Sequence, residues 1–411
     1  MKKSLSYLIL SLFIFSAVAQ ERHLALDECL ALAYENNPSY KAGKLSVDKA
    51  ATLKGSSFDA PNTGIELSQD ATGGGSMENG LKFSQEFEFP TVYIAKRKVL
   101  KADYSLAQGE LLEKKNQLTA DISSAYYSLV YAIQKVRILK ELDDAYSNFR
   151  RIAQARYESG DASKLEAVNA GRLSDRCRRN LQEAQGEVEK NSLLLANLIG
   201  LNEKVVPAEE TLTVLTLPDM PETLDVNSTL HGHLLELMLN RSEQNLGLAK
   251  QEFMPGLFVA ATTQLLIKGF NPYHVDRPRF EKGNFMGFQV GITVPLFFGA
   301  KRARLLAARQ EVEITRLNNE AESMALQREY DDAKAQFALS RGSLDYYESE
   351  GIEQANEIAR LAKVSYELGE IDYLEYIQNM ETASEVILEY IECIDKYNQT
   401  IIRINTLKGT L

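Results

Sequence analysis

Two long stretches of the chain carry apolar residues at the spacing of a coiled coil. Residues 92–157 contain no proline and one glycine, Gly109, and their apolar positions alternate at intervals of four and three residues. This first seam consists of Leu118, Ile122, Ala125, Leu129, Ala132, Val136 and Leu139, and a second seam consists of Leu326, Tyr330, Ala333, Phe337, Ser340 and Leu344. The pattern predicts two long helices that pack along most of their length.

Shorter helices are expected beside each long one. A helix over residues 92–157 would extend about 100 Å and would need packing partners along that distance. Helical patterns over residues 26–59 and 162–200 together have nearly the length of the first long helix, and those over 223–253 and 371–408 serve the second half in the same way. The sequence therefore predicts a mainly α fold built as a wall of long helices.

Four segments between these helices have the pattern of β-strands. Residues 80–89 and 285–294 alternate between apolar and polar positions, and residues 65–69 and 257–264 are weaker strands that complete two hairpins. The connections over 70–79 and 265–284 read as exposed loops. Segments of about ten residues with this alternation suit membrane-spanning strands, although a soluble antiparallel sheet shows the same pattern. Aromatic residues at the ends of the strands are candidates for a membrane interface: Phe87, Phe89, Phe297 and Phe298.

The second half of the chain repeats the order of the first. Phe89-Pro90 followed by Ala95-Lys96-Arg97 recurs as Val294-Pro295 followed by Ala300-Lys301-Arg302, and Tyr157-Glu158-x-Gly160 recurs as Tyr366-Glu367-x-Gly369. We interpret the chain as a tandem duplication of residues 20–204 and 223–411, joined by a linker over 205–222. Four strands cannot close a membrane barrel, so the chain must oligomerise, with two copies giving 8 strands and three giving 12.

The N-terminal residues and the composition narrow the class of protein. Lys2 and Lys3 precede an apolar run over residues 5–15 and the small residues Ala17-Val18-Ala19, which predicts a signal peptide over residues 1–19. The net charge of -11 excludes a protein that binds nucleic acid through its phosphates. No catalytic, cofactor or metal motif is evident, because His231 and His233 would point to different sides of a helix. We expect no enzyme activity, no cofactor and no metal site.

Three motifs carry a resemblance to a known family. They are Asp27-Glu28-x-Leu30-Ala31-Leu32-Ala33-x-x-Asn36-Asn37-Pro38, the strand end Phe87-Glu88-Phe89-Pro90, and the turns Arg156-Tyr157-x-x-Gly160 and Tyr366-x-x-Gly369. With these motifs the chain resembles the TolC-like outer-membrane efflux channels, and within them it is most similar to components of heavy-metal efflux systems. The resemblance implies a homotrimer whose 12 strands form one barrel in the outer membrane of a Gram-negative bacterium, continued by a helical tunnel through the periplasm.

The resemblance also implies partners, cargo and sites. The chain would be a passive exit duct for substrates such as heavy-metal cations or drugs, and would work with a periplasmic adaptor and an inner-membrane pump of the resistance-nodulation-division type. The adaptor would dock at the helix turns, at Tyr157, Gly160, Tyr366 and Gly369. Glu166, Asp372 and Glu375 are candidate pore-gate acids, because inward carboxylates repeated around a threefold axis would favour cations. The alternative function is a periplasmic coiled-coil adaptor or scaffold of an export complex.

Overall fold

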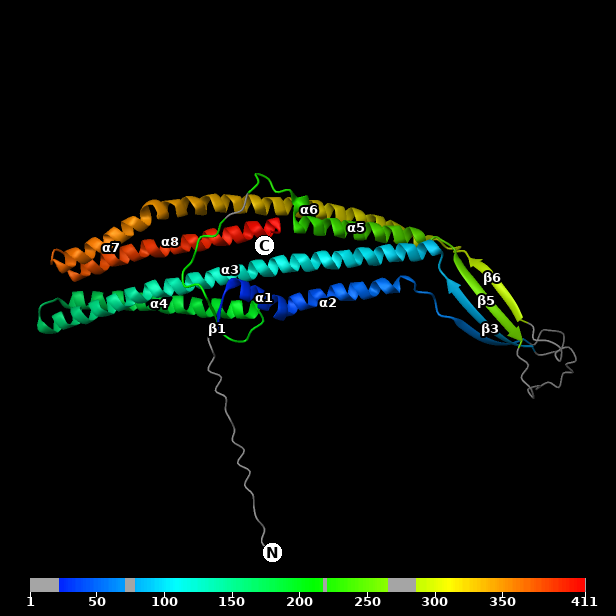
Figure 1. Cartoon of the computed structure of the whole chain (residues 1–411), viewed down its shortest axis with the longest axis horizontal. Helices are drawn as coiled ribbons and strands as arrows, with labels where there is room; N and C mark the ends of the chain where they lie inside the picture. The colour runs from blue at the N-terminus through cyan, green and yellow to red at the C-terminus, as the bar shows by residue number, and fades with distance from the viewer. Residues whose placement is uncertain (1–21, 71–77, 217–219, 265–285, 411) are drawn as a thin grey trace, which may run out of the picture. The chain divides into compact units, whose positions relative to one another are not determined.

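The computed structural model describes residues 22–70, 78–216, 220–264 and 286–410 (Figure 1). The predicted signal peptide over residues 1–19 and most of the two predicted loops lie outside these ranges. The described chain is mainly helical, with one four-stranded and one two-stranded sheet. The predicted fold class, mainly α with a small β part, is confirmed at this level. None of the described helices is both long enough and apolar enough to cross a membrane.

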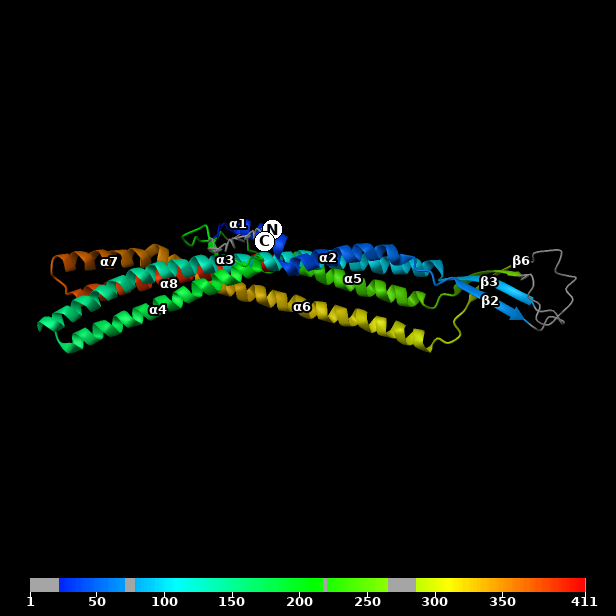
Figure 2. The ribbon, with the colours of Figure 1, turned by 90° about the horizontal axis from the view of Figure 1, so that it is seen from below.

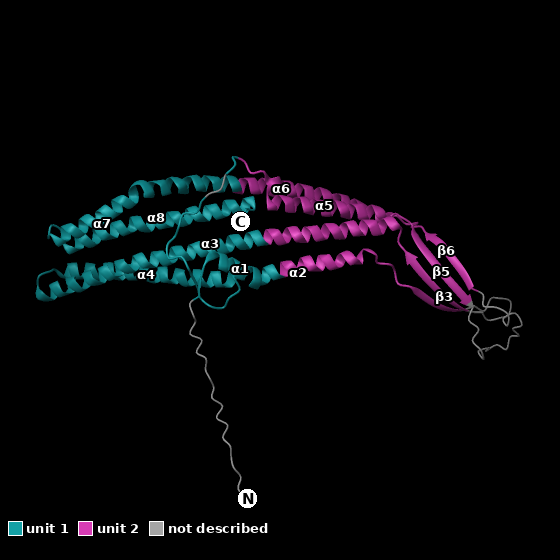
Figure 3. Cartoon of the chain, viewed as in Figure 1, with its two compact units in different colours: residues 1–41, 115–222, 330–411 teal, residues 42–114, 223–329 magenta. Residues whose placement is uncertain are grey.

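The chain divides into two compact units (Figure 3). Unit 1 comprises residues 1–41, 115–222 and 330–411, and unit 2 comprises residues 42–114 and 223–329. Each unit takes segments from both halves of the sequence, so neither unit corresponds to one predicted repeat. The duplication, its boundaries and the linker remain predictions.

The first long helix forms where the heptad pattern predicts it. Helix α3 (Pro90–Ser159) has 70 residues, and Pro90 occupies its first position, where a missing N–H costs nothing. Helix α4 (Lys164–Leu198) follows it after a short turn. In unit 1, the seam of α3 continues through Leu139, Leu142, Tyr146, Phe149 and Ala153, which pack against buried residues of α4, namely Ala170, Cys177, Leu181 and Ala184.

The helix expected over residues 26–59 is divided in two. Helix α1 (Leu26–Asn36) ends before Asn37, and helix α2 (Pro38–Leu53) begins at Pro38 and continues into a short 3₁₀ turn, η1 (Lys54–Ser57). The division has a local cause, since the helical region is disfavoured for a residue before proline, and Asn37 has ψ 121°. The Asn37 side chain accepts a hydrogen bond from the backbone N–H of Tyr40 and donates one to the carbonyl of Leu198.

The second half contains a second long helix with one irregular turn. Helix α5 (Leu230–Gln251) follows the 3₁₀ turn η2 (Val226–Ser228), and helix α6 (Gly299–Tyr346) passes through the π-helical turn η4 (Tyr347–Gly351) into helix α7 (Ile352–Glu367). Helix α8 (Tyr373–Lys408) lies beside α7 in both views (Figures 1 and 2). A β-carbon at Gly351 would lie only 2.9 Å from the ring of Tyr347, which explains glycine at the end of the π turn.

A small parallel sheet in unit 1 escaped the sequence analysis. Strand β1 (Arg22–Leu24) pairs with β4 (Val205–Pro207), which occupies the first three residues of the predicted linker. The backbone of Val205 is also fixed by Ser192, whose hydroxyl donates to the Val205 carbonyl and accepts from the Val205 N–H. Three-residue strands have no measurable alternation, so the pattern could not reveal them.

The four predicted strands form a single sheet in unit 2. Strands β2 (Gly64–Asp70), β3 (Glu78–Phe87), β5 (Gly256–Gln264) and β6 (Met286–Thr293) are arranged in the order β2-β3-β5-β6, and all neighbours are antiparallel. The two hairpins therefore join through β3 and β5. The strand predicted to end at Phe89 stops at Phe87, because the Phe89 carbonyl already accepts from Val92 at the start of α3.

Candidate functional site: the sheet and the helix turns

The sheet of unit 2 has one apolar face that is exposed. Residues directly opposite each other in an antiparallel register point to the same side, and the register places Ile65 opposite Phe83, and Val259 opposite Val290. Phe288 is 73% exposed and Val290 is 80% exposed. This face carries Ile65, Leu67, Leu81, Phe83, Phe87, Leu257, Val259, Ala261, Met286, Phe288, Val290 and Ile292, together with the polar residues Gln85 and Thr263. A contiguous apolar face of this kind marks a surface that a membrane or a partner covers.

One polar residue on this face, Gln85, is held by hydrogen bonds. Its amide donates to the carbonyl of Pro61 at 2.6 Å, and its oxygen accepts from the Thr63 hydroxyl, also at 2.6 Å. Both partners lie in the segment before β2, at the end of the sheet nearest the helices. The amide is therefore satisfied within the chain, which lowers the cost of placing it among apolar side chains.

The opposite face of the sheet is mainly polar, and its apolar residues are Phe258 and Ala260. It carries Glu66, Ser68, Lys82, Ser84, Glu86, Thr262, Gln289 and Thr293. Glu66 and Lys82 are direct cross-strand neighbours, and their carboxylate and ammonium groups lie 3.8 Å apart. The two faces thus differ as expected for a sheet with apolar material on one side and water on the other.

The sheet also has two open edges. Strands β2 and β6 each have one neighbour among the described strands. Unpaired N–H and C=O groups along an edge are costly in a membrane, so such a sheet needs further strands before it can be inserted. A second copy of β6 placed beside β2 would supply them.

The four expected interface aromatics differ in their surroundings. Phe87 and Phe89 are half-buried, whereas Phe297 is 91% exposed. The ring of Phe298 stacks on that of Phe253, with centroids 6.0 Å apart. Phe297 is therefore the residue of this group with the most surface available for a lipid interface.

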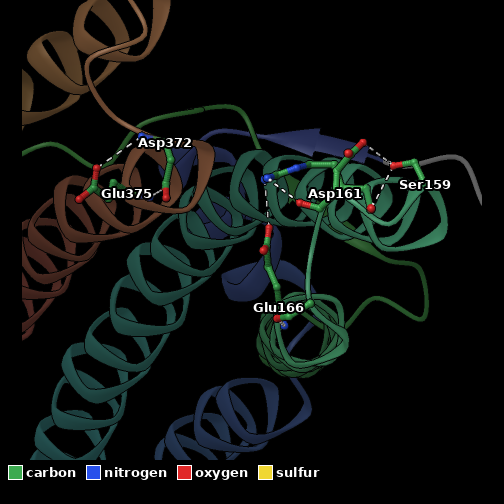
Figure 4. Close-up of polar contacts among 7 residues, drawn as sticks. Ser159, Asp161, Glu166, Asp372 and Glu375 are labelled. Atoms are coloured by element: carbon green, nitrogen blue, oxygen red, sulfur yellow. Dashed lines mark hydrogen bonds and ion pairs between the residues drawn. The ribbon is translucent and has the colours of Figure 1, made fainter.

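The first helix turn, between α3 and α4, is built around Gly160. Gly160 has φ +86°, and the N–H groups of Asp161 and Ala162 both donate to the carbonyl of Arg156. Glu166 lies in the first turn of α4 and accepts from the Arg156 guanidinium at 3.1 Å (Figure 4). The negative charge of this candidate gate residue is thus largely balanced within the chain.

The second helix turn, between α7 and α8, has a different charge arrangement. Gly369 has φ +75°, and Asp372 is the N-cap of α8. Asp372 accepts from the N–H of Glu375 at 2.8 Å, and Glu375 accepts from the N–H of Asp372 at 3.4 Å, which forms a capping box (Figure 4). The structure therefore brings Asp372 and Glu375 together, and both carboxylates bond only to backbone groups within the described turn.

The two predicted tyrosines are both partly exposed at the turns. Tyr157 is 39% exposed and Tyr366 is 38% exposed. The ring of Tyr366 lies 5.0 Å from that of Tyr376 and 5.3 Å from that of Tyr373. Tyr373 accepts a hydrogen bond from Asn148 in α3, and burial raises the pKa of its phenol. The sequence analysis missed Tyr373 and Tyr376, although their spacing on α8 was a usable signal.

A second group missed by the sequence analysis surrounds Glu381 of α8. Its carboxylate accepts from the Tyr146 hydroxyl of α3 and from the Arg176 guanidinium of α4. Burial and the bond to Glu381 raise the pKa of the Tyr146 phenol well above its usual range. Glu381 therefore connects α8 to α3 and α4 within unit 1.

We expect the two turn glycines to tolerate alanine only at a cost. Ordinary residues lose about 1–2 kcal/mol in the left-handed region, and no atom lies within 4 Å of a β-carbon at Gly160 or Gly369, so strain is the whole effect. Gly160→Ala and Gly369→Ala should each lower the free energy of unfolding by that amount. Gly186→Ala within α4, also without neighbours, should instead stabilise by about 0.5–1 kcal/mol. Equal effects in thermal unfolding would contradict this expectation.

His231 and His233 contact different carboxylates. His231 Nδ1 lies 3.4 Å from Glu113 of α3, and His233 Nδ1 lies 3.6 Å from Glu236. The hydrogen bond to Glu113 raises the pKa of His231, against the opposing effect of burial. Among the described residues, no group of three or more His, Cys, Asp or Glu side chains could hold a metal ion.

The raised pKa of His231 predicts a stability that depends on pH. A histidine whose pKa is higher in the folded than in the unfolded state stabilises the fold when it is protonated. This stabilisation is complete below the unfolded pKa of 6.5 and is lost as the pH rises through the folded pKa. We expect the free energy of unfolding of the wild type to fall by less than ~1 kcal/mol in this way, since the pair of His231 and Glu113 is partly exposed. His231→Gln should abolish this loss, and His233→Gln should retain it, when denaturant unfolding is followed from acid to alkaline pH. An identical profile for both variants would refute the assignment.

Comparison with known proteins defines the class. The sequence profile of the outer membrane efflux protein family matches residues 31–201 and 235–410. Since the matched segments cover most of the chain, the protein belongs to this family, and the predicted family and its outer-membrane location are confirmed.

Individual relatives share little sequence identity with this chain. The chain is 20% identical over 394 residues to the cobalt-zinc-cadmium resistance protein CzcC of Cupriavidus metallidurans, covering 94% of this chain and 90% of CzcC. The fold is similar to that of CusC, with TM-score 0.74, 17% identity, and coverage of 95% of this chain and 93% of CusC. It is also similar to the outer membrane channel CmeC of Campylobacter jejuni, with TM-score 0.75, 16% identity, and coverage of 94% and 85%.

Proposed function

We propose that this protein is the outer-membrane exit duct of a tripartite efflux system. Three copies would contribute 12 strands to one barrel, with the apolar faces toward lipid and the polar faces toward a water-filled pore. The observation that carries the proposal is the open four-stranded sheet with one exposed apolar face and one polar face. Each edge strand β2 would then pair with β6 of a neighbouring copy.

The helical part of the chain would continue the pore into the periplasm. A coiled-coil seam along α3 supports packing into a helical tunnel. In this proposal a periplasmic adaptor contacts the turns at Tyr157 and Tyr366, both of which are partly exposed, and an inner-membrane pump of the resistance-nodulation-division type supplies the energy. The duct itself performs no catalysis.

Divalent metal cations are the cargo that we propose for the duct. The name of CzcC concerns resistance to cobalt, zinc and cadmium, and a chain with net charge -11 is electrostatically suited to cations. Drugs are the second candidate cargo. Growth of a deletion strain on metal salts and on antibiotics would distinguish the two.

The alternative of a periplasmic adaptor or scaffold leaves the apolar face of the sheet unexplained. An adaptor without a membrane anchor should be released from membranes by carbonate, whereas a barrel protein should need detergent. The test is to extract the full-length protein from outer membranes and to reconstitute it in planar bilayers. Detergent-dependent extraction, cross-linking to a trimer and steady conductance are expected. Release by carbonate, or a monomer without conductance, would overturn the proposal.

The contribution of Asp372 and Glu375 to the charge of the proposed pore can be tested. Their carboxylates bond to backbone N–H groups alone within the described turn, whereas Glu166 is paired with Arg156. If the acids of α8 line the pore, Glu375→Gln should raise the concentration of a trivalent cobalt ammine needed for half block on the order of tenfold. Glutamine keeps an acceptor for the capping box, so the turn should remain intact.

Glu166→Gln is the matched control for this measurement. Its charge is already balanced by Arg156 at 3.1 Å, so its effect on block should be several times smaller. Equal block in the wild type and in the Glu375 variant would remove Glu375 from the set of gate acids.

A further inference from the structure

Five exposed basic residues follow the sheet of unit 2 along the chain. We define the basic patches as Arg97, Lys98 and Lys101 near the start of α3, and Arg302 and Arg309 near the start of α6. All five side chains are exposed. The two patches belong to the same unit as the sheet, and each begins within three turns of the point where the chain leaves a strand.

The residues of each patch share one face of their helix. Positions three, four and seven residues apart lie on the same side of an α-helix. On α3 this places Arg97, Lys98 and Lys101 beside Ile94, which is 57% exposed, and on α6 it places Arg302 and Arg309 beside Leu306, which is 55% exposed. Each patch thus combines cations with an exposed aliphatic side chain.

The patches are not used for pairing inside the chain. None of the five side chains makes a hydrogen bond or an ion pair with another residue that the structure describes. Two neighbouring basic residues do form ion pairs within the chain. Lys96 lies 2.5 Å from Glu88, and Arg304 lies 3.2 Å from Glu252. Asp103, the next acidic residue along α3, is already paired with Arg241, whose Nε lies 2.7 Å from the Asp103 carboxylate. The positive charge of the patches is therefore available to an external anion.

A cavity beside the α3 patch has the chemistry of a phosphate site. It has a volume of about 310 Å³ and is lined by Lys98, Lys101, Ser105, Asn240 and Gln244. The Gln244 amide donates to the oxygen of Asn240, so the Asn240 side chain retains its NH₂ group as a donor. Two ammonium groups, a hydroxyl and an amide donor are a set that suits phosphate oxygens.

The first residue of each patch lies close to the expected surface of a bilayer. Arg97 lies seven residues after Pro90, about 10 Å along the helix axis, and Arg302 lies three residues after Gly299, about 5 Å. The headgroup region extends ~5–7 Å beyond the hydrocarbon on each side of a membrane. Long basic side chains can reach back toward this region, while their aliphatic neighbours face the acyl boundary.

We propose that the basic patches bind the anionic headgroups of phospholipids, such as phosphatidylglycerol and cardiolipin, in the leaflet next to the helices. This inference rests on the proposed function, because it takes the sheet as the membrane-spanning part. After the exposed apolar strand β6, the chain passes through Phe297 and then reaches the basic residues of α6. These three features match the hydrocarbon core, the interface and the headgroup region of a membrane, in that order. The patches would fix the depth of the protein in the membrane by charge as well as by apolar contact.

The experiment measures lipid binding by the full-length protein in neutral detergent. Fluorescent cardiolipin is titrated into the wild type, with phosphatidylcholine and inorganic phosphate as separate competitors. The α3 variant carries Arg97→Gln, Lys98→Gln and Lys101→Gln, and the α6 variant carries Arg302→Gln and Arg309→Gln. Each basic residue near an anionic surface contributes about fivefold to the affinity. The affinity for cardiolipin should therefore fall on the order of 100-fold in the α3 variant and about 25-fold in the α6 variant.

A control that removes as many charges as the two patches together comes from unit 1. Its five substitutions replace exposed cations far along the chain from the sheet, and they are Lys140→Gln, Arg172→Gln, Arg179→Gln, Lys190→Gln and Lys363→Gln. This variant should bind cardiolipin like the wild type. Binding by the wild type should also weaken steeply with added salt, a measurement that needs no variant to fold.

Several results would overturn the inference. They are equal affinity of the wild type for cardiolipin and phosphatidylcholine, equal loss of affinity in the control, and full competition by inorganic phosphate at the concentration of the lipid. A change of ion selectivity in the variants without a loss of lipid binding would place the patches in the pore instead. Conductance keeps the two proposals separate: a wild type that conducts without preferring anionic lipid refutes the patches alone, whereas a wild type that forms no channel refutes the exit duct.

Discussion

Replacing Gly232 by alanine is expected to destabilise unit 2 by about 3 kcal/mol or more. A β-carbon at this position would lie 1.9 Å from the carbonyl oxygen and 2.7 Å from the carbonyl carbon of Val226. Both are backbone atoms of η2, so no side chain can rotate away. Overpacking in a well-packed region costs about 1–3 kcal/mol and more where the backbone must move.

The same substitution would also disturb the start of α5. Thr229 is the N-cap of this helix, and its hydroxyl accepts from the N–H of Gly232 at 3.0 Å. A shift of Gly232 away from Val226 would lengthen that bond, and loss of a threonine cap costs about 1 kcal/mol. The expected result is a much lower unfolding temperature by circular dichroism and faster cleavage by trypsin within residues 223–329.

Gly247→Ala is the matched control in the same helix. No atom lies within 4 Å of a β-carbon at Gly247, and alanine is favoured over glycine in a helix by about 0.5–1 kcal/mol. This variant should therefore be slightly more stable than the wild type. If the two alanine variants were equally stable, the close approach of α5 to η2 would be refuted.

The sequence predicted the elements of this fold better than their interruptions. A seam such as that of α3 repeats over many turns, so each added heptad strengthens the signal, and the helix was found to within two residues at each end. The break at Asn37 could have been predicted, because Pro38 disfavours the helical conformation of the residue before it. The π turn at Tyr347–Gly351 could not, since it depends on how one ring packs against a glycine.

The candidate site shows the same division between local and distant signals. Glycines at the helix turns and alternation in the strands are local properties, and both were evident from the sequence. The bonds that join Glu381 to Tyr146 and Arg176 connect residues more than two hundred positions apart, so no spacing could indicate them. The different partners of the acids at the two turns also required coordinates, because Arg156 could have paired with several acids near Gly160.

Placing a charge on the apolar face of β6 is expected to prevent stable insertion into the membrane. Val290 is 80% exposed and lies opposite Val259 in the register. An arginine near the midplane of a bilayer costs about 2–4 kcal/mol on a lipid-facing strand. With one copy in each of three subunits, Val290→Arg would cost ~6–12 kcal/mol per proposed trimer. We expect little protein in detergent extracts of outer membranes and no conductance.

Gln289→Arg provides the control one residue earlier on the same strand. Successive side chains of a strand point to opposite faces, and Gln289 lies opposite Ala260 on the polar face. An arginine there would face the proposed water-filled pore and should leave insertion intact, with a change only in conductance or ion selectivity. The reverse result, with Gln289→Arg lost from the membrane and Val290→Arg retained, would mean that the sheet faces lipid with its polar side. Since the two residues are adjacent on one strand, the side of the sheet is the main difference between the two variants.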